Sequence, residues 1–117
     1  MGDHPVDAFI RSALKTQGLA PNPPASPRDL IRRLHWDLVG LPPEPQLVAE
    51  FERDPSRLRY EALVERLLAS PRYGERWARH WMDVVRYTES QGFEYDRPRD
   101  HAWPFRDYVI ASFNQNK

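Results

Sequence analysis

Apolar residues recur every three or four positions along most of this chain, and prolines divide the pattern into segments. This spacing is typical of amphipathic helices, and no stretch alternates with period two for long enough to form a strand. The twelve prolines mostly fall between the periodic segments, where proline starts or ends a helix without breaking one. The pattern predicts an all-α fold: a single compact bundle of five to six helices joined by short turns rich in proline and glycine.

Proline and glycine bound the first two predicted helices. The first follows Pro5 and stops at Gly18, which can adopt the left-handed conformation that ends a helix. The second begins at Ser26–Pro27, where an N-cap hydroxyl precedes a proline in the first helical position, and its apolar stripe runs to Gly40. The candidate N-caps of the first helix are Asp3 and His4.

Four further helices are predicted by the same signals. A short one lies within LPPEPQLVAEFERDP and is stopped by Asp54–Pro55, which also starts the next. Ser70–Pro71 repeats the cap signal and starts a helix over residues 70–90. The last carries aromatic residues from Trp103 to Phe113 and can be capped by Asp100.

The segment LVGLPPEP predicts a corner after the second helix. Gly40 is expected to be left-handed, because glycine has no Cβ to oppose that conformation. The run from Leu41 to Pro43 is expected to be extended, because a residue before proline avoids the helical region.

The predicted helix over SPRYGERWARHWMDVVRYTES concentrates aromatic and charged side chains. At 100° per residue, Trp77 and Trp81 share a face with Val84 and Val85. Large aromatic residues at helical spacing are usually buried, so this face is expected to pack against the second, fourth and last helices. The alternative is a stacking platform for a sugar ring or a base, which requires a tryptophan face open to water.

His80, Asp83 and Arg86 are the candidate catalytic residues on the polar border of this helix. The structural interpretation is a half-buried His80 that hydrogen-bonds Asp83 or a carbonyl. The catalytic interpretation is a general base oriented by Asp83. No metal site is predicted, because H-x-x-D supplies two ligands at most and the helix lacks an HExxH pattern.

The segment between residues 89 and 101 is predicted to be a long polar loop, and such loops often carry function. Its acids could hold a cation or sugar hydroxyls, or serve as a glycosidase pair. The alternative is that Arg97 and Arg99 pair with the acids of the loop and fix its path. The candidate ligand-binding residues are Glu89, Tyr95, Asp96 and Arg97.

Charge and composition narrow the classes of function. Seventeen basic and seventeen acidic residues leave no net charge, so the chain lacks the positive field typical of nucleic-acid binders. The absence of cysteine removes disulfides, thiolate metal sites and a thiol nucleophile. No apolar run is long enough for a transmembrane helix, and the first residues do not form a signal peptide. The whole sequence is expected to form a single helical domain, excised from a longer multidomain protein.

Three segments carry a family resemblance: LIRRLHWDLVGLPPEP, the stretch from FERDPSRLRYEALVERLLASP to RYTESQGFEYDR, and AWPFRDYVIASFNQNK. Together they resemble a planctomycete-type domain of unknown function that accompanies cytochrome-c-like modules in large multidomain proteins. The resemblance implies an extracytoplasmic or membrane-associated parent protein, with neighbouring domains as partners. It also implies that haem c belongs to a separate module, and this chain has no CxxCH attachment motif. No cofactor is expected in this domain.

Two hypotheses follow from the sequence. The first is a helical interaction module that docks against neighbouring domains of its parent chain. The second is part of an enzyme or carbohydrate-binding unit, built on the polar side of the tryptophan helix and the 89–101 loop. An exposed apolar patch favours the first, and a concave pocket with convergent polar groups over the tryptophan helix favours the second.

Overall fold

The computed structural model describes residues 4–117, and these form six helices with no strand. The prediction of an all-α fold joined by proline- and glycine-containing turns is confirmed. The helices are α1 (Pro5–Thr16), α2 (Pro27–Leu38), α3 (Pro45–Arg53), α4 (Arg57–Leu68), α5 (Pro71–Val84) and α6 (Trp103–Asn114).

Side-chain caps start most of the helices where the sequence predicts them. The hydroxyls of Ser26, Ser56 and Ser70 accept backbone N–H groups in the first turns of α2, α4 and α5. His4 caps α1, while the other candidate, Asp3, lies outside the described residues. The helix α6 differs from the prediction: its N-cap is Ala102 and not Asp100, and it has no side-chain cap.

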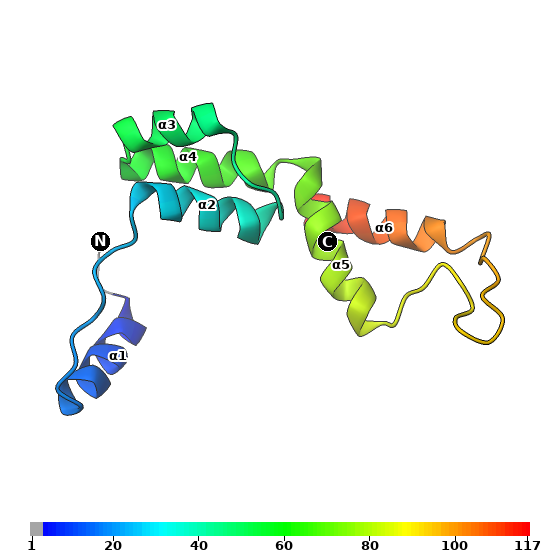
Figure 1. The fold of residues 1–117 in the computed structure, drawn as a ribbon, viewed down its shortest axis with the longest axis horizontal. Coiled ribbons are helices and arrows are strands. Elements are labelled where there is room, and N and C mark those ends of the chain that lie inside the picture. Colours follow the sequence, from blue (N-terminus) through cyan, green and yellow to red (C-terminus); the bar gives the residue numbers. More distant parts are fainter. Residues whose placement is uncertain (1–3) are drawn as a thin grey trace.

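The helices α2, α3 and α4 pack side by side as a three-helix bundle (Figure 1). Each contributes apolar residues from one face to a common core, as expected for amphipathic helices. Apolar burial of this kind contributes about 25 cal/mol per Å², so these side chains supply most of the stabilisation of the bundle. The buried cluster consists of Ile31, Leu34, Val39, Phe51, Leu63 and Leu67.

The helices α5 and α6 form a second group, in which they pack directly on each other. The contact is close because it is made by small residues of α5: Gly74 and Ala78 are buried, and Val109 is the buried residue of α6. Asn114 joins the two helices, since its Oδ1 accepts the N–H of Gly74 at 2.8 Å and its Nδ2 donates to the carbonyl of Pro71 at 3.2 Å.

The two groups lie beside each other and do not surround one core, and α1 lies apart from both (Figure 1). The radius of gyration is accordingly 19.9 Å, compared with about 13 Å for a compact domain of this length. The helix α1 buries none of its residues, and Phe9 is 78% exposed.

The corner at the end of α2 has the predicted left-handed glycine. Gly40 has a φ of 70°, and Leu41 to Pro43 are not helical. A second reason for glycine emerges from the packing: a Cβ at position 40 would lie 2.7 Å from Cδ of Arg76 on α5. The corner therefore also sets how closely α5 approaches the end of α2.

Gly74→Ala should destabilise the α5–α6 pair. Its Cβ would lie 2.5 Å from the carbonyl oxygen of Ile110 and 2.6 Å from Asn114, so the helices would have to separate. Overpacking costs about 1–3 kcal/mol, which outweighs the gain of about 1 kcal/mol that alanine brings to a helix. Urea unfolding followed by tryptophan fluorescence measures the loss, and the exposed neighbour change Glu75→Ala is the control. A Gly74→Ala variant as stable as the parent would contradict this packing.

Gly40→Ala should cost about 1 kcal/mol for the left-handed backbone alone, and more because Arg76 must move. A double-mutant cycle with Arg76→Ala separates the two effects. The Gly40→Ala penalty should be smaller in the Arg76→Ala background, and equal penalties would show that only the backbone requires glycine.

Candidate functional site

The predicted catalytic pair is on the surface of α5. His80 and Asp83 are both exposed, and the His80 ring packs against Trp77 with the ring centroids 5.4 Å apart. Within the described part of the chain, neither side chain makes a hydrogen bond, so the predicted bond from His80 to Asp83 or to a carbonyl is wrong. A general base needs an orienting partner, and this imidazole has none here.

Arg86 lies beyond the end of α5, because the helix stops at Val84 and does not continue to residue 90 as predicted. The chain leaves the helix through Arg86, which has a φ of 56°. The N–H of Tyr87 donates to the carbonyl of Met82 at 2.9 Å, and the N–H of Arg86 donates to that of Asp83 at 3.3 Å. This pair of bonds is a Schellman ending, usually made with glycine, so Arg86 is not on the same helical face as His80 and Asp83.

Glu89 is tied to α6. Its carboxylate accepts hydrogen bonds from Arg106 and from the hydroxyl of Tyr87, the latter at 3.1 Å. The Tyr87 ring also packs on Phe105, with centroids 5.9 Å apart. Partial burial raises the pKa of the Tyr87 hydroxyl, and the hydrogen bond to Glu89 raises it further. This network anchors the loop to α6 and occupies the carboxylate.

Backbone hydrogen bonds fix the rest of the 89–101 loop. The N–H of Gln91 donates to the carbonyl of Arg97 at 2.9 Å, and that of Arg99 donates to the carbonyl of Glu89 at 2.7 Å. Asp96 has a φ of 38° in the turn between them. Among the described residues, the side chains of Arg97 and Arg99 form no ion pair with the loop acids, so that alternative is wrong. Tyr95, Asp96 and Arg97 are all exposed.

The tryptophans of α5 are less buried than predicted. Trp77 is half-buried, whereas Trp81 is 50% exposed, so the prediction that both are largely buried is wrong for Trp81. The reason is the close contact through Gly74 and Ala78. Because α6 packs on the small residues of α5, it covers the tryptophan face only in part.

Trp81 therefore lines an apolar groove between α5 and α6, which we call the Trp81 groove. Its volume is about 500 Å³. Tyr108 of α6 also lines the groove and is 64% exposed, and Val84 beside Trp81 is exposed as well. The groove is lined by Trp81, Tyr108, Val109, Ser112, Phe113 and Lys117, and neither His80 nor Asp83 is part of it.

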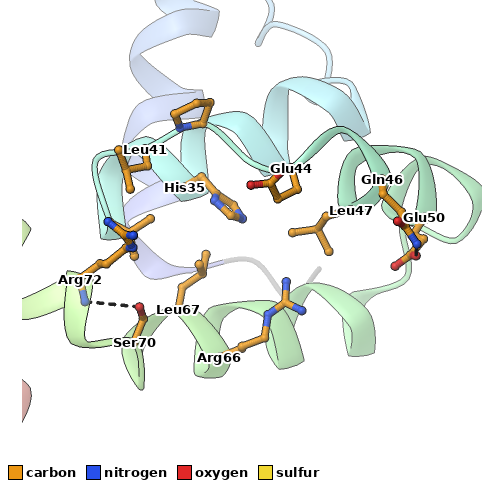
Figure 2. Close-up of a pocket in the computed structure, with 12 residues that line it drawn as sticks. His35, Leu41, Glu44, Gln46, Leu47, Glu50, Arg66, Leu67, Ser70 and Arg72 are labelled. Carbon is orange, nitrogen blue, oxygen red and sulfur yellow. Dashed lines mark hydrogen bonds between the residues drawn. The ribbon is translucent and has the colours of Figure 1, made fainter.

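A second concave site, the His35 cavity, lies between the end of α2, the 39–44 connection, α3 and α4, and has a volume of about 600 Å³. Figure 2 shows His35 of α2 and Arg66 of α4 reaching toward the cavity from opposite walls. His35 is 8% exposed, and its Nε2 is buried without a hydrogen-bond partner in the described chain. Burial lowers the pKa of the His35 imidazole, and the charge of Arg66 lowers it further.

The cavity carries charges of both signs. Glu50 accepts a hydrogen bond from Gln46 at 3.0 Å, away from His35 in Figure 2. The guanidinium groups of Arg66 and Arg72 make no ion pair with any described residue. Ion pairs of surface arginines contribute little to stability, so the lack of such a pair is not unusual. What distinguishes Arg66 is its position opposite a buried imidazole whose Nε2 has no hydrogen-bond partner in the described chain.

His35 is not among the candidate site residues predicted from the sequence, so this site was missed. The available signal was its spacing: His35 follows Ile31 by four positions and precedes Leu38 by three, which places it on the apolar face of α2. A polar residue on that face indicates either a satisfied core histidine or a site. The role of α3 and α4 as the opposite wall depends on tertiary packing and has no signal in the sequence.

Two general properties narrow the class of protein. Across residues 4–117, no cluster of three or more His, Cys, Asp or Glu side chains could hold a metal ion. None of the helices in that part of the chain has both the length and the apolar character needed to cross a membrane. The fold and sites thus define an all-α domain with an aromatic groove and a polar cavity.

The chain belongs to a family described as proteins of unknown function, DUF1549 (PSCyt2), whose sequence model matches residues 5–117. The match covers both helix groups and α1. No curated protein and no solved structure matches the chain. The resemblance to a domain of unknown function is therefore confirmed.

The burial of His35 predicts a loss of stability in mild acid. Because the folded-state pKa is lowered, the stabilisation is complete above the unfolded-state pKa of about 6.5 and is lost as the pH falls through the folded-state value. The free energy of unfolding should fall by up to about 1.4 kcal/mol per pH unit in that window.

Urea unfolding at several pH values between neutral and mildly acidic measures this dependence. His35→Gln should flatten it, whereas the exposed control His101→Gln should leave it unchanged. A steep dependence that persists in His35→Gln would assign the proton uptake to another group.

Proposed function

We propose that this protein is a helical interaction module that docks through the Trp81 groove onto a neighbouring domain of a longer chain. The expected neighbour is a cytochrome-c-like module, and the expected location of the assembly is extracytoplasmic or membrane-associated. The observation that carries the proposal is that Trp81 and Tyr108 are both exposed in one groove. The contact between α5 and α6 leaves this part of their apolar surface uncovered.

Packing energetics support a protein partner. Two helices packed on each other leave part of their apolar faces exposed to water. In a stable domain a further helix or sheet normally packs against those faces. Trp and Tyr are the residues most enriched at the energetic centres of protein interfaces, where each buries a large area at low entropic cost. In the Trp81 groove the tryptophan and the tyrosine lie beside the apolar residues Val109 and Phe113, and few polar groups line the groove.

The alternative is an enzyme or carbohydrate-binding unit, and the exposed Trp81 gives it one specific support, since a sugar ring can stack on an open indole. The polar residues predicted to complete such a site do not join it. His80 and Asp83 lie outside the groove, and Glu89 is already hydrogen-bonded to Arg106 and Tyr87. A sugar site needs convergent hydrogen-bonding groups, so we favour a protein partner.

The test is to mix this chain with the separately expressed cytochrome-c-like segment of its natural gene product and to measure binding by calorimetry. Trp81→Lys and Tyr108→Lys should each weaken the complex roughly thirtyfold, as expected for an interface residue worth about 2 kcal/mol. The matched control is Phe9→Lys on α1, which removes another exposed aromatic residue and should not change the affinity.

Folding of the variants is checked by urea unfolding. Because Trp81 is half exposed, Trp81→Lys should change the free energy of unfolding by about 1 kcal/mol or less, and not by the 3–5 kcal/mol of a buried tryptophan. The absence of a neighbouring domain in the natural gene product, or a complex that tolerates both lysine variants, would contradict the proposal. Self-association abolished by Trp81→Lys would assign the groove to a second copy of the chain. Quenching of Trp81 fluorescence by a neutral oligosaccharide would favour the carbohydrate alternative.

A further inference from the structure

The His35 cavity is unrelated to the Trp81 groove and has the dimensions of a small-molecule site. Its volume of about 600 Å³ lies within the range of about 300–1,000 Å³ that is usual for ligand pockets. Its walls combine five apolar residues with seven polar or charged ones, which come from separate elements. The apolar residues are Val39, Leu41, Pro42, Leu47 and Leu67.

The buried imidazole is the feature that points to a ligand. A buried nitrogen without a hydrogen bond costs about 1–3 kcal/mol, and within the part of the chain that the structure describes Nε2 of His35 is such a nitrogen. Arg66 faces the ring from the opposite wall of the cavity (Figure 2), and its charge acts on the imidazole. A group that accepts a hydrogen bond from Nε2–H and neutralises Arg66 would satisfy both at once.

We propose that the His35 cavity binds a carboxylate carried on a small apolar group, which Arg66 and the Nε2–H of His35 hold between them. Arginine matches a carboxylate with two parallel hydrogen bonds, and a neutral imidazole can donate a third. The apolar body lies against Leu41, Leu47 and Leu67. The carboxylate belongs either to a free organic acid or to the C-terminus of a peptide.

The charges around the cavity favour a singly charged ligand over a phosphate. Glu44 and Glu50 line the same cavity and repel a multiply charged anion. His35 and the two glutamates line this cavity, but they do not form a cluster that could hold a metal ion, and the described residues contain no other such cluster. A divalent cation is therefore disfavoured as the ligand. The same acids repel a single carboxylate less, because the repulsion scales with the charge of the ligand.

The experiment is an NMR titration of the ¹⁵N-labelled chain with 4-methylpentanoate, following the His35 ring and the amides of Leu41, Leu47 and Leu67. We expect saturable shifts at these groups, with a dissociation constant of about 1 mM or lower. The neutral analogue 4-methylpentanamide and inorganic phosphate should bind at least about tenfold more weakly, since neither fits a single carboxylate clamp. Equal binding of the acid and its amide, or no shifts at the cavity, would overturn the proposal.

Variants assign the two clamp residues. Arg66→Gln should weaken binding of 4-methylpentanoate about tenfold, whereas Arg53→Gln, which removes an exposed arginine at the end of α3, should not. His35→Phe should weaken binding and His35→Gln should restore part of it, because the amide can donate a hydrogen bond. If the His35 variants do not fold, Arg66→Gln decides alone, because its side chain is exposed. Unchanged affinity in Arg66→Gln would overturn the proposal.

The source of the carboxylate is resolved with a short peptide that ends in leucine. Tighter binding of the free-acid peptide than of 4-methylpentanoate, lost on C-terminal amidation, would support recognition of a peptide terminus. Binding of the small acid without binding of the peptide would support a free organic acid. Both results support the carboxylate site, and failure of both acids to bind would overturn it without bearing on the Trp81 groove.

Discussion

The close contact between α5 and α6 is the constraint on which most of the functional surface depends. Gly74 brings the backbone of α5 so near to Ile110 and Asn114 that no side chain fits between the helices. Asn114 then hydrogen-bonds the first turn of α5 and holds the two helices together. Because α6 is committed to the small residues of α5, it covers Trp81 only in part. Trp81, which its residue type and helical spacing predict to be buried, is therefore left on the surface.

The two helix groups differ in how much apolar surface they bury, and each keeps one feature that costs stability. The bundle of α2, α3 and α4 has the larger apolar core, yet it also encloses a histidine whose Nε2 has no hydrogen-bond partner among residues 4–117. The α5–α6 pair buries little, and Trp81, Trp103 and Tyr108 are each at least half exposed. A buried polar atom without a hydrogen bond lowers the stability of a core. A helix pair that leaves aromatic side chains exposed to water is also less stable than one that buries them. Such sacrifices are expected at sites that bind something.

The polar side of α5 contributes less than its crowding of charges suggests. The side chains of His80 and Asp83 are on the surface and make no hydrogen bond among the described residues, and Arg86 has left the helix. The carboxylate of Glu89 joins α6 through Arg106, so it acts as an anchor for the loop. Surface ion pairs of this kind contribute little to stability, about 0–1 kcal/mol, and their role here is to position the loop.

The sequence by itself determined the helices and their ends. Proline, serine caps and the left-handed Gly40 act within a few residues, so local physical chemistry was sufficient to place most boundaries and to predict the corner after α2. The end of α5 was mispredicted because Arg86, a residue that rarely adopts a positive φ, supplies the turn that glycine usually makes. Only the tertiary structure decided which apolar faces are covered. Whether Trp81 is exposed depends on α6, and whether His35 lines a cavity depends on α3 and α4. These contacts join residues far apart in the chain, and helical periodicity predicts that a face is apolar but not what packs against it.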